Sequence, residues 1–406
     1  MKTPKSSFKN RLRTTILVLL GAAWPATAGT QVVAWGAGTF VSSPPDYNNY
    51  GQSIVPPSLT NAAFVSGGWR HSLALNADGS LTGWGDDTLG QTDFPSGETN
   101  FLAVACGRLH SLALQTNGQV LAAGDDVFGQ SDVPASLSNV VAVSCGFYHS
   151  LVLRADSTVA AWGTSTNPAD IGTDPSYGQA LVPAGLSNVV AIAAGGWHNL
   201  ALHPGGTVVG WGRDDSFQAD PPLWLSNAVA ISAGAAHSLA LRANGTVVAW
   251  GLNTYGQTNV PAGLSNVVAI SAGGWHNLAL KSDGTVVAWG AGGPSTNALV
   301  VYGQNMVPPG LTNVQQVAGG NVHSLALVGN GPPTTGAFLT GGTLGTNGFT
   351  VSVPTRYGHV YRLEFSTSLP AISWQPLPLQ AGSGSKLILI DPTPTGTQRF
   401  YRVREW

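Results

Sequence analysis

The chain has 406 residues and a formal net charge of −2, and only 9% of its residues are charged, against roughly 25% in an average soluble protein. Lysine and glutamate, which cover the wet faces of surface helices, are scarce, so a helical bundle or coiled coil is excluded. Glycine and proline, with 53 and 26 residues, stay below the ~25–30% that is typical of disordered chains.

Residues 1–28 have the pattern of a secretory signal peptide. Five basic residues up to Arg13 precede the apolar run 16–23, and Ala26-Thr27-Ala28 is a typical cleavage signal. No other run approaches the ~18 apolar residues of a membrane-spanning helix. We therefore expect an exported protein, secreted or on the cell surface, without a membrane span. Its mature chain would be acidic, which argues against a nucleic-acid partner.

Residues 29–329 contain seven copies of one repeat. A His-Ser/Asn-Leu-Ala/Val-Leu motif recurs mostly every 39 residues, and an aromatic-Gly-Gln element is a further signature. A strand ending in Trp-Gly accompanies the motif in six copies, and the seventh copy of this strand ends in Ala123-Gly124. At Phe217-Gln218 the usual glycine is replaced by Phe. Repeats of this length indicate a stacked or circular architecture. The motif begins at His71, His110, His149, His198, His237, His276 and His323.

One unit shows the strands that each repeat predicts. Val267–Ala272 is an apolar run typical of a buried strand, and His276–Leu280 alternates in character. Asp283-Gly284 predicts a hairpin turn into a third strand ending at Trp289. The segment 255–261 is expected to add a short outer strand, since its proline belongs at an edge. Four antiparallel strands repeated seven times predict an all-β, seven-bladed β-propeller.

The first and last copies are incomplete in complementary ways. Val32–Gly36 is a Trp-Gly strand with no motif strand before it, and His323–Leu327 is a motif strand with no Trp-Gly strand after it. If the two strands pair, they complete one blade. The N-terminal strand then closes the ring and leaves few free edges.

These elements resemble regulator of chromosome condensation repeats. The resemblance rests on Gly-x-x-His-Ser-Leu-Ala-Leu, Asp-Gly-x-Val, Trp-Gly and Gly-Gln and covers about residues 31–328. It implies a seven-bladed propeller but no particular function. The nuclear guanine-nucleotide exchange factor that names the family has a role that an exported acidic chain does not fit. Secreted relatives include a proteinaceous inhibitor that binds its target with one propeller face.

The loops before each histidine combine a constant glycine with variable tips, which suggests a binding face. Trp, Tyr, Phe and Arg dominate protein-binding hot spots. The alternative is that these aromatic residues cap the central channel. The candidate contact residues are Trp69, Arg70, Arg108, Phe147, Tyr148, Trp197 and Trp275.

The loops after the Trp-Gly strands should share this face. Three of them are long, at 37–49, 164–176 and 291–301, and several carry paired aspartates. An acidic rim would steer a basic partner toward the face. Turn chemistry is one alternative role for these residues, and calcium binding and glycan cleavage by paired carboxylates are two others. The pairs are Asp86-Asp87, Asp125-Asp126 and Asp214-Asp215.

The histidines and cysteines are not expected to bind metal. One histidine per blade in a seven-fold ring cannot converge on one ion at ~2 Å, so buried, hydrogen-bonded histidines are the expectation. Cys106 and Cys145 occupy equivalent positions of adjacent blades. They fit either buried free thiols or a disulfide, which export would permit.

Beyond the repeats, residues 330–337 have the composition of a linker. Residues 338–406 should form a small β-sandwich-like module with strands at 349–353, 360–365, 387–390 and 400–403. Its sequence is similar to C-terminal modules of large secreted bacterial proteins, whose role the motif leaves open as anchoring, sorting or glycan binding.

Taken together, the sequence predicts an exported, non-enzymatic and cofactor-free binding protein. The expected partner is an extracellular or cell-surface protein bound by one propeller face, and the chain is expected to be a monomer. The alternative is a glycan-binding or glycan-cleaving extracellular propeller.

Overall fold

The computed structural model describes residues 30–39, 48–164, 175–292, 302–330, 340–345, 348–356, 358–367, 374–384, 386–394 and 399–406. The expected signal peptide lies outside these residues, as do nearly all of the expected linker and the central parts of the three long loops. Every helix or strand assigned in the described ranges is a β-strand, as the composition predicts.

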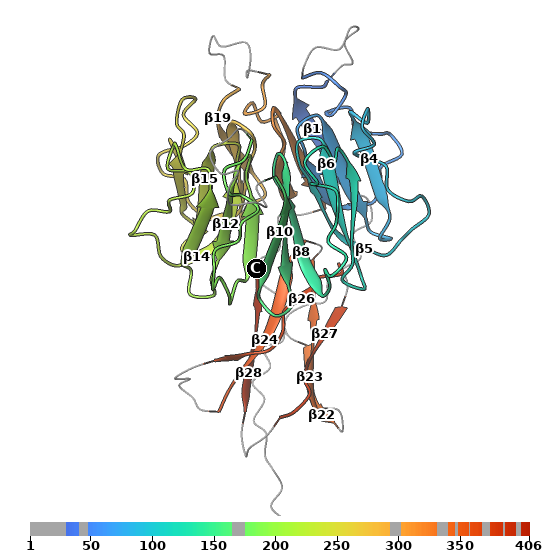
Figure 1. The fold of residues 1–406 in the computed structure, drawn as a ribbon, viewed down its shortest axis with the longest axis vertical. Coiled ribbons are helices and arrows are strands. Elements are labelled where there is room, and N and C mark those ends of the chain that lie inside the picture. Colours follow the sequence, from blue (N-terminus) through green and yellow to red (C-terminus); the bar gives the residue numbers. More distant parts are fainter. Residues whose placement is uncertain are drawn as a thin grey trace, which may run out of the picture.

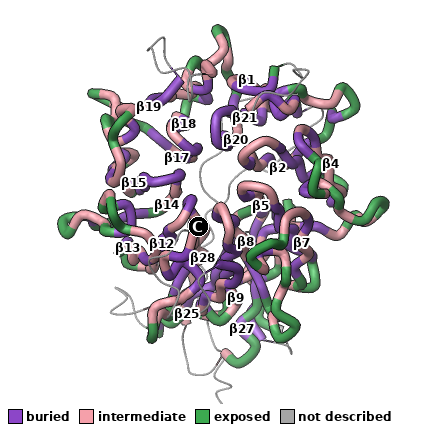
Figure 2. Tube along the Cα trace, turned by 45° about the horizontal axis from the view of Figure 1, so that its top comes forward, coloured by how far each residue is buried: buried purple, intermediate pink, exposed green. Residues whose placement is uncertain are grey.

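Seven three-stranded antiparallel sheets form the blades of a ring around a central opening (Figure 2). In each blade the innermost strand leads to the motif strand, which pairs on its other side with the Trp-Gly strand. This confirms the predicted propeller. Blades 1 to 3 are β2 (Ala62–Gly67), β3 (His71–Asn76), β4 (Leu81–Gly85); β5 (Phe101–Cys106), β6 (His110–Gln115), β7 (Val120–Gly124); and β8 (Val140–Cys145), β9 (His149–Arg154), β10 (Val159–Gly163). Blades 4 to 6 are β11 (Ala191–Ala194), β12 (His198–Leu202), β13 (Val208–Gly212); β14 (Ala228–Ala233), β15 (His237–Arg242), β16 (Val247–Gly251); and β17 (Val267–Ala272), β18 (His276–Lys281), β19 (Val286–Gly290).

The seventh blade joins the two ends of the repeat region, as predicted. It consists of β20 (Val314–Gly319), β21 (His323–Val328) and the N-terminal strand β1 (Gln31–Gly36), in the order β1-β21-β20. In this pairing Trp35 lies opposite Ser324, which is where Trp-Gly strands stand in the other blades. The ring is therefore closed by hydrogen bonds between strands rather than by loops.

Each histidine of the motif links its blade to the next. His71 Nε2 lies 2.7 Å from Ser111 Oγ in the following blade, and His323 Nε2 lies 2.9 Å from Ser72 Oγ, which completes the circle. In two blades the partner is an Asn Oδ1 atom, as in the 2.8 Å contact of His149 with Asn199, so there the imidazole donates through Nε2. Burial lowers the pKa of all seven imidazoles to about 3 or 4. They are neutral structural groups.

The predicted fourth strand is absent from the described blades. After β16 the chain makes consecutive turns, in which Gly256 N donates to Asn253 O and Asn259 N donates to Gly256 O, each at 3.1 Å. Gln257 between them is buried, and its carbonyl accepts from Trp289 Nε1 at 3.0 Å. The segment therefore lies at the outer edge as a series of turns. It contacts the next blade and does not add a strand to the sheet.

The C-terminal module consists of two sheets that share a core, which agrees with the sandwich-like prediction. One sheet has the order β22 (Thr340–Gly345), β23 (Gly348–Pro354), β27 (Lys386–Asp391). The other is built on β24 (Val360–Ser366), which pairs with β25 (Gln375–Pro376), β26 (Gln380–Ala381) and β28 (Phe400–Glu405). Side chains of both sheets, Val351 and Leu363 among them, form one buried cluster.

Figure 1 shows this module beneath the propeller. It packs on the turns between motif strands and Trp-Gly strands: Leu379 N donates to Ala155 O at 2.9 Å, and Arg404 Nη1 donates to Pro204 O at 3.0 Å. Trp406 also packs against the apolar clusters of that region. We call this side of the ring the hairpin face and the opposite side the loop face. The module therefore leaves the loop face uncovered.

Candidate binding face

The two sets of loops that the sequence assigns to one face do lie together. The residue after each Trp-Gly strand donates its backbone N–H to the carbonyl of the residue before each histidine, as in Asp86 N to Arg70 O at 2.9 Å and Ala291 N to Trp275 O at 2.8 Å. The ends of the first and third long loops also meet, through Asn48 Nδ2 and Tyr302 Oη at 2.8 Å. All of the predicted contact residues consequently belong to the loop face.

The constant glycine of these loops has a steric reason. A Cβ atom on Gly146 would lie 2.0 Å from Cε1 of His149 and 2.7 Å from the carbonyl oxygen of Gly195 in the next blade. The backbone must therefore pass directly over the buried imidazole. The imidazole therefore fixes the position of the loop backbone in every blade. Only the two residues that follow the glycine differ freely from one repeat to the next.

Five of the predicted contact residues form one aromatic and cationic cluster over blades 1 to 4. The Phe147 ring lies 5.0 Å from Trp69 and 4.7 Å from Trp197, centroid to centroid. The guanidinium of Arg108 stacks at 4.3 Å on Trp69 and at 4.9 Å on Tyr148. All five side chains are half-buried. We call these five residues the aromatic cluster.

The remaining two predicted contact residues lie in separate pairs. Arg70 stacks on Tyr50 at 4.7 Å, and Trp275 meets Tyr255 edge-on at 5.8 Å. The tyrosines belong to the aromatic-Gly-Gln element, which sequence reasoning treated only as a repeat signature. That element supplies further face residues that were missed: Phe128 packs on Tyr148, and Tyr177 stacks with Arg213.

The paired aspartates are engaged in their own turns. Asp87, Asp126 and Asp214 each accept, at 2.8 Å, the backbone N–H of the residue five positions on. Asn253 does the same in the next blade at 2.9 Å, so the position selects an acceptor rather than a charge.

The other three aspartates are held equally locally. Asp86 and Asp125 accept backbone N–H groups two residues on, and Asp215 pairs with Arg213 at 2.5 Å. The pair Asp214-Asp215 thus stands one position later in its turn than the other two pairs, and Arg213 takes the place of the first aspartate. The rim is less acidic at blade 4 than the sequence suggests.

Phe217 adopts a backbone conformation that only glycine has in the equivalent turns. Its φ is 59°, whereas Gly90 and Gly256 have 74° and 77°. For a bulky residue this left-handed conformation costs about 1–3 kcal/mol. The side chain is nonetheless 69% exposed, so its packing does not compensate for the strain. An exposed aromatic residue is therefore kept on the loop face at an energetic cost.

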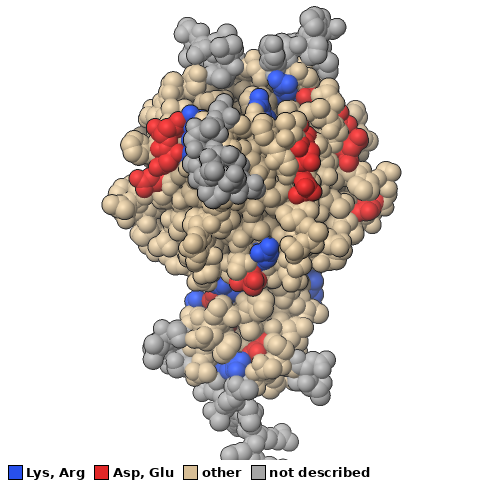
Figure 3. Space-filling model, in the orientation of Figure 1, with Lys and Arg blue, Asp and Glu red and all other residues tan. Residues whose placement is uncertain are grey.

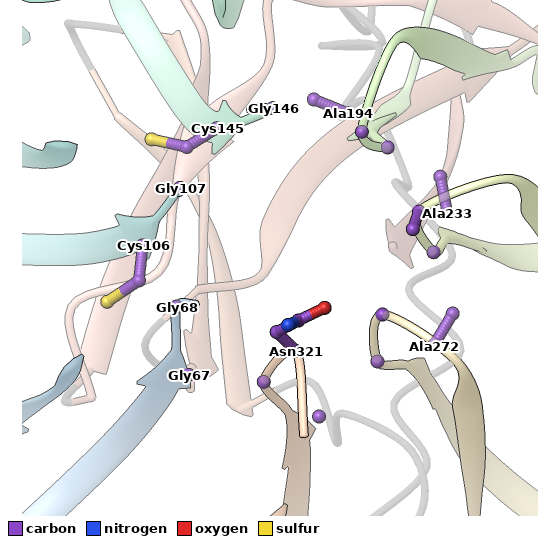
Figure 4. A pocket seen from close by; sticks show the side chains of 18 of the residues that line it. Gly67, Gly68, Cys106, Gly107, Cys145, Gly146, Ala194, Ala233, Ala272 and Asn321 are labelled. Atoms are coloured by element: carbon purple, nitrogen blue, oxygen red, sulfur yellow. The ribbon is translucent and has the colours of Figure 1, made fainter. Parts of the chain in front are cut away.

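At the centre of the ring lies an opening of about 210 Å³. Its lining comes from the inner strands and the loop tips of all seven blades and contains no charged side chain. Trp69 and Phe147 are the aromatic residues of this lining. The Phe147 ring packs over Gly196 of the next blade, and Oδ1 of Asn321 lies directly beside Gly274. Asn321 extends toward the opening (Figure 4). The aromatic residues of the lining thus come from blades 1 and 3.

Both cysteines line this opening as free thiols, so the disulfide considered from the sequence is not formed. The thiol of Cys145 donates to Ala105 O at 3.2 Å, and that of Cys106 to Ser66 O at 3.5 Å. Each sulfur is turned toward the preceding blade and away from the opening (Figure 4). Burial raises the pKa of Cys106 to about 12, so the thiol is unreactive.

Charged side chains are sparse on the visible surface, with acidic groups on the flanks of the propeller (Figure 3). Within the described ranges, no three His, Cys, Asp or Glu side chains are grouped so that they could hold a metal ion. The same part of the chain contains no helix long and apolar enough to cross a membrane.

Comparison with known proteins identifies the repeats. The family model described as "Regulator of chromosome condensation (RCC1) repeat" matches residues 63–91, 101–130, 140–167, 189–218, 228–257 and 267–293. The split seventh blade lies outside these segments. A search of curated protein sequences found no match.

Solved structures of similar fold cover most of the chain. Human WBSCR16 has a TM-score of 0.54 and 20% identity, over 74% of this chain and 99% of its own. Prp20p from Saccharomyces cerevisiae, whose structure was described together with its binding to Gsp1p and histones, has a TM-score of 0.57 and 18% identity, over 74% and 92%. Yeast RCC1 (Prp20) bound to Kap60 has the same two values, over 80% and 97%. These likenesses show the fold.

Proposed function

The chain belongs to the family of regulator of chromosome condensation repeat proteins, and on that premise we propose that it is an exported, non-enzymatic protein that binds another protein through its loop face. The partner is an extracellular or cell-surface protein. The yeast relative, whose binding to Gsp1p and histones has been described, supports protein binding in general. The choice of face comes from this chain's own residues.

The aromatic cluster carries the proposal. Aromatic and Arg side chains in a half-buried, central position are the residues that dominate protein interfaces. Here they are already packed against one another, so little side-chain entropy would be lost on binding. The C-terminal module packs on the hairpin face and leaves this one accessible. The strained, exposed Phe217 adds an aromatic side chain to the same face.

The turn aspartates support binding rather than catalysis. Glycoside hydrolysis needs two carboxyl groups that face one cleft, with one free to donate a proton. Asp87, Asp126 and Asp214 instead accept backbone N–H groups within their own turns. A glycan partner is the competing hypothesis.

The test is a crosslinking pull-down with the chain 29–406 as bait, from the medium and cell surface of the producing organism. A Trp69→Ala/Phe147→Ala/Trp197→Ala variant should lose the captured protein, and Arg108→Ala, which removes no buried ring, should weaken its capture. Trp224→Ala is the matched control, because this exposed Trp lies on the connection to β14, outside the loop face.

Each outcome decides between the hypotheses. A protein recovered by the chain and by Trp224→Ala, but not by the triple variant, supports the loop face and identifies the partner. Equal capture by all baits contradicts the proposed face. Tight and selective binding on a glycan array, lost in the triple variant, would replace the protein partner with a glycan.

A further inference from the structure

We propose that the chain forms a weak dimer with two-fold symmetry, in which the turn that carries Leu223 and Trp224 in each copy enters a hollow beside Lys281 of the other copy. The inference goes beyond the proposed function, because this contact lies outside the loop face. It rests on an exposed apolar turn, on an incompletely covered hollow in the next blade, and on opposite charges beside the two. We call residues 222–225 the apolar turn.

The apolar turn differs from its equivalents in the other repeats. The connections that lead to six of the seven inner strands share one turn, in which the N–H of a leucine donates to the carbonyl of a proline three residues earlier, as in Leu225 N to Pro222 O at 2.8 Å. In the five other turns the two middle residues are Pro57-Ser58, Ala135-Ser136, Ala184-Gly185, Ala262-Gly263 and Pro309-Gly310. Here they are Leu223 and Trp224, which are 103% and 64% exposed. These side chains gain little from folding and are available to a partner, and Trp is the residue type most typical of interface hot spots.

The equivalent turn of the next blade borders a hollow of about 270 Å³, lined by Leu264, Lys281 and Val287 among others. Leu264 and Val287 are half-buried, whereas the residues at the same positions of blade 5, Leu225 and Val248, are only 7% and 8% exposed. The folded chain therefore covers the apolar groups of the hollow incompletely. Its volume lies below the ~300–1,000 Å³ of small-molecule sites and suits an inserted side chain.

The apolar turn and the hollow lie one blade apart at the same level of the ring. Just after the apolar turn Asn227 O accepts from Ala243 N, and at the hollow Asn266 O accepts from Ser282 N, both at 2.9 Å. Ala243 and Ser282 belong to turns of the hairpin face, so both features lie at that end of the ring. Two copies related by a two-fold axis near blade 5 can therefore exchange their turns, because such an interface brings residue i of each copy to residue j of the other.

Opposite charges stand beside the apolar turn and the hollow. Asp220 is exposed two residues before the turn, and Lys281 lines the hollow. Lys281 pairs with Asp283 at 3.0 Å, but both side chains are partly exposed, and surface pairs of this kind contribute little. The ammonium can thus turn to Asp220 of a second copy and also contact the indole of Trp224. An anionic lipid surface would instead be repelled by Asp220, so the charges favour a second copy as the occupant.

The first test is sedimentation velocity of the chain 29–406. An interface made by two short turns is expected to bury less than the ~1,200 Å² of stable complexes, so dimers should form at about 10–100 µM. The monomer expected from the sequence would then be the form at low concentration. The variant Leu223→Ala/Trp224→Gly should raise the dimer Kd at least tenfold.

This double variant has a fold control within the chain. It gives the apolar turn the Ala-Gly sequence found at 184–185 and 262–263, so its melting temperature should stay unchanged. A chain that stays monomeric at all concentrations, a dimer that persists in the double variant, or growth into larger species would each overturn the proposal.

The second test exchanges the charges. Asp220→Lys and Lys281→Asp should each be monomeric alone, because like charges then meet at both contacts. An equal mixture of the two variants should form the dimer again, since one contact has exchanged charges and the other has the original ones. A mixture that stays monomeric would contradict the pairing of the apolar turn with the hollow.

The matched control for the charge exchange is Asp132→Lys. Asp132 has the same place before the turn that leads to β8, and its N–H donates to Gly129 O at 3.3 Å, as that of Asp220 donates to Phe217 O at 3.4 Å. This variant should dimerise like the original chain, and so should Trp69→Ala/Phe147→Ala/Trp197→Ala, which alters only the loop face. Loss of the dimer in either variant would contradict the assigned contact.

Discussion

At the scale of single residues, Phe217 lowers the stability of the folded chain and supplies an exposed aromatic side chain to the loop face. Replacing it by Gly removes the strain of its positive φ and loses little packing, because the ring is largely exposed. We expect Phe217→Gly to raise the free energy of unfolding by about 1 kcal/mol, measured by urea denaturation, while binding of the partner weakens. Phe217→Ala is the control: it removes the ring, keeps the strained Cβ, and should give no gain in stability. An equal gain in both variants would refute the backbone explanation.

The seven buried histidines predict a steep acid sensitivity. Their pKa values in the folded protein, about 3 to 4, lie below the 6.5 of a free imidazole, so below pH 6.5 the unfolded chain binds more protons. The free energy of unfolding should therefore be highest above pH 6.5 and fall toward pH 4, by up to about 1.4 kcal/mol per pH unit for each histidine. Urea midpoints between pH 8 and 5 test this. A His237→Gln variant should show a shallower slope, and a midpoint that does not change with pH would contradict the neutral ring.

At the scale of elements, β1 is the strand on which closure depends. Trp35 is buried, and its Nε1 donates to Gln304 O at 2.9 Å. Trp35→Ala should destabilise the propeller by about 3–5 kcal/mol, as for other buried Trp residues, and Trp250→Ala should cost a similar amount. Only Trp35→Ala should speed hydrogen exchange in both β1 and β21, since those strands join the two chain ends. Similar exchange in the two variants would show that closure does not depend on β1.

Most of the strands could be predicted because every repeat has the same pattern of residues. The seven motif strands, the Trp-Gly strands and the pairing of Val32–Gly36 with His323–Leu327 all follow from one alternation of residues. The outer segment was predicted wrongly as a strand, because an edge proline is compatible with both a strand and a turn. The role of its buried Gln257 is visible only once the neighbouring Trp289 is in place.

The sequence predicted which face of the ring the site residues share, but not which of their side chains touch. Spacing placed Trp69, Phe147 and Trp197 on one side of the ring, yet it could not show that rings from blades 1, 3 and 4 touch. Nor could it show that Oδ1 of Asn321 lies against Gly274 of the neighbouring blade. The glycines at 196 and 274 have an evident role only once the ring brings Phe147 and Asn321 of neighbouring blades over them.

At the scale of the whole molecule, the proposed export can be tested directly. Residues 1–28 should be removed after Ala28, so that the mature chain begins at Gly29. Expression with the native N-terminus in a bacterial host, followed by mass spectrometry of the exported fraction, measures the cleavage site. An Ala28→Asp variant should remain unprocessed. Intact Met1–Trp406 confined to the cytoplasm would contradict export.

The closure of the ring also sets an order of events during biosynthesis. The strand that leaves the ribosome first, β1, finds its partner only when β21 has been made, almost 290 residues later. At roughly 5–20 residues per second, this is a wait of about 15–60 s. During that time blades 1 to 6 can each fold from local contacts, while β1 keeps its hydrogen-bonding groups without their final partner. The earliest part of the propeller to be synthesised is therefore the last to be assembled, and any factor that shields an unpaired strand would act on this segment.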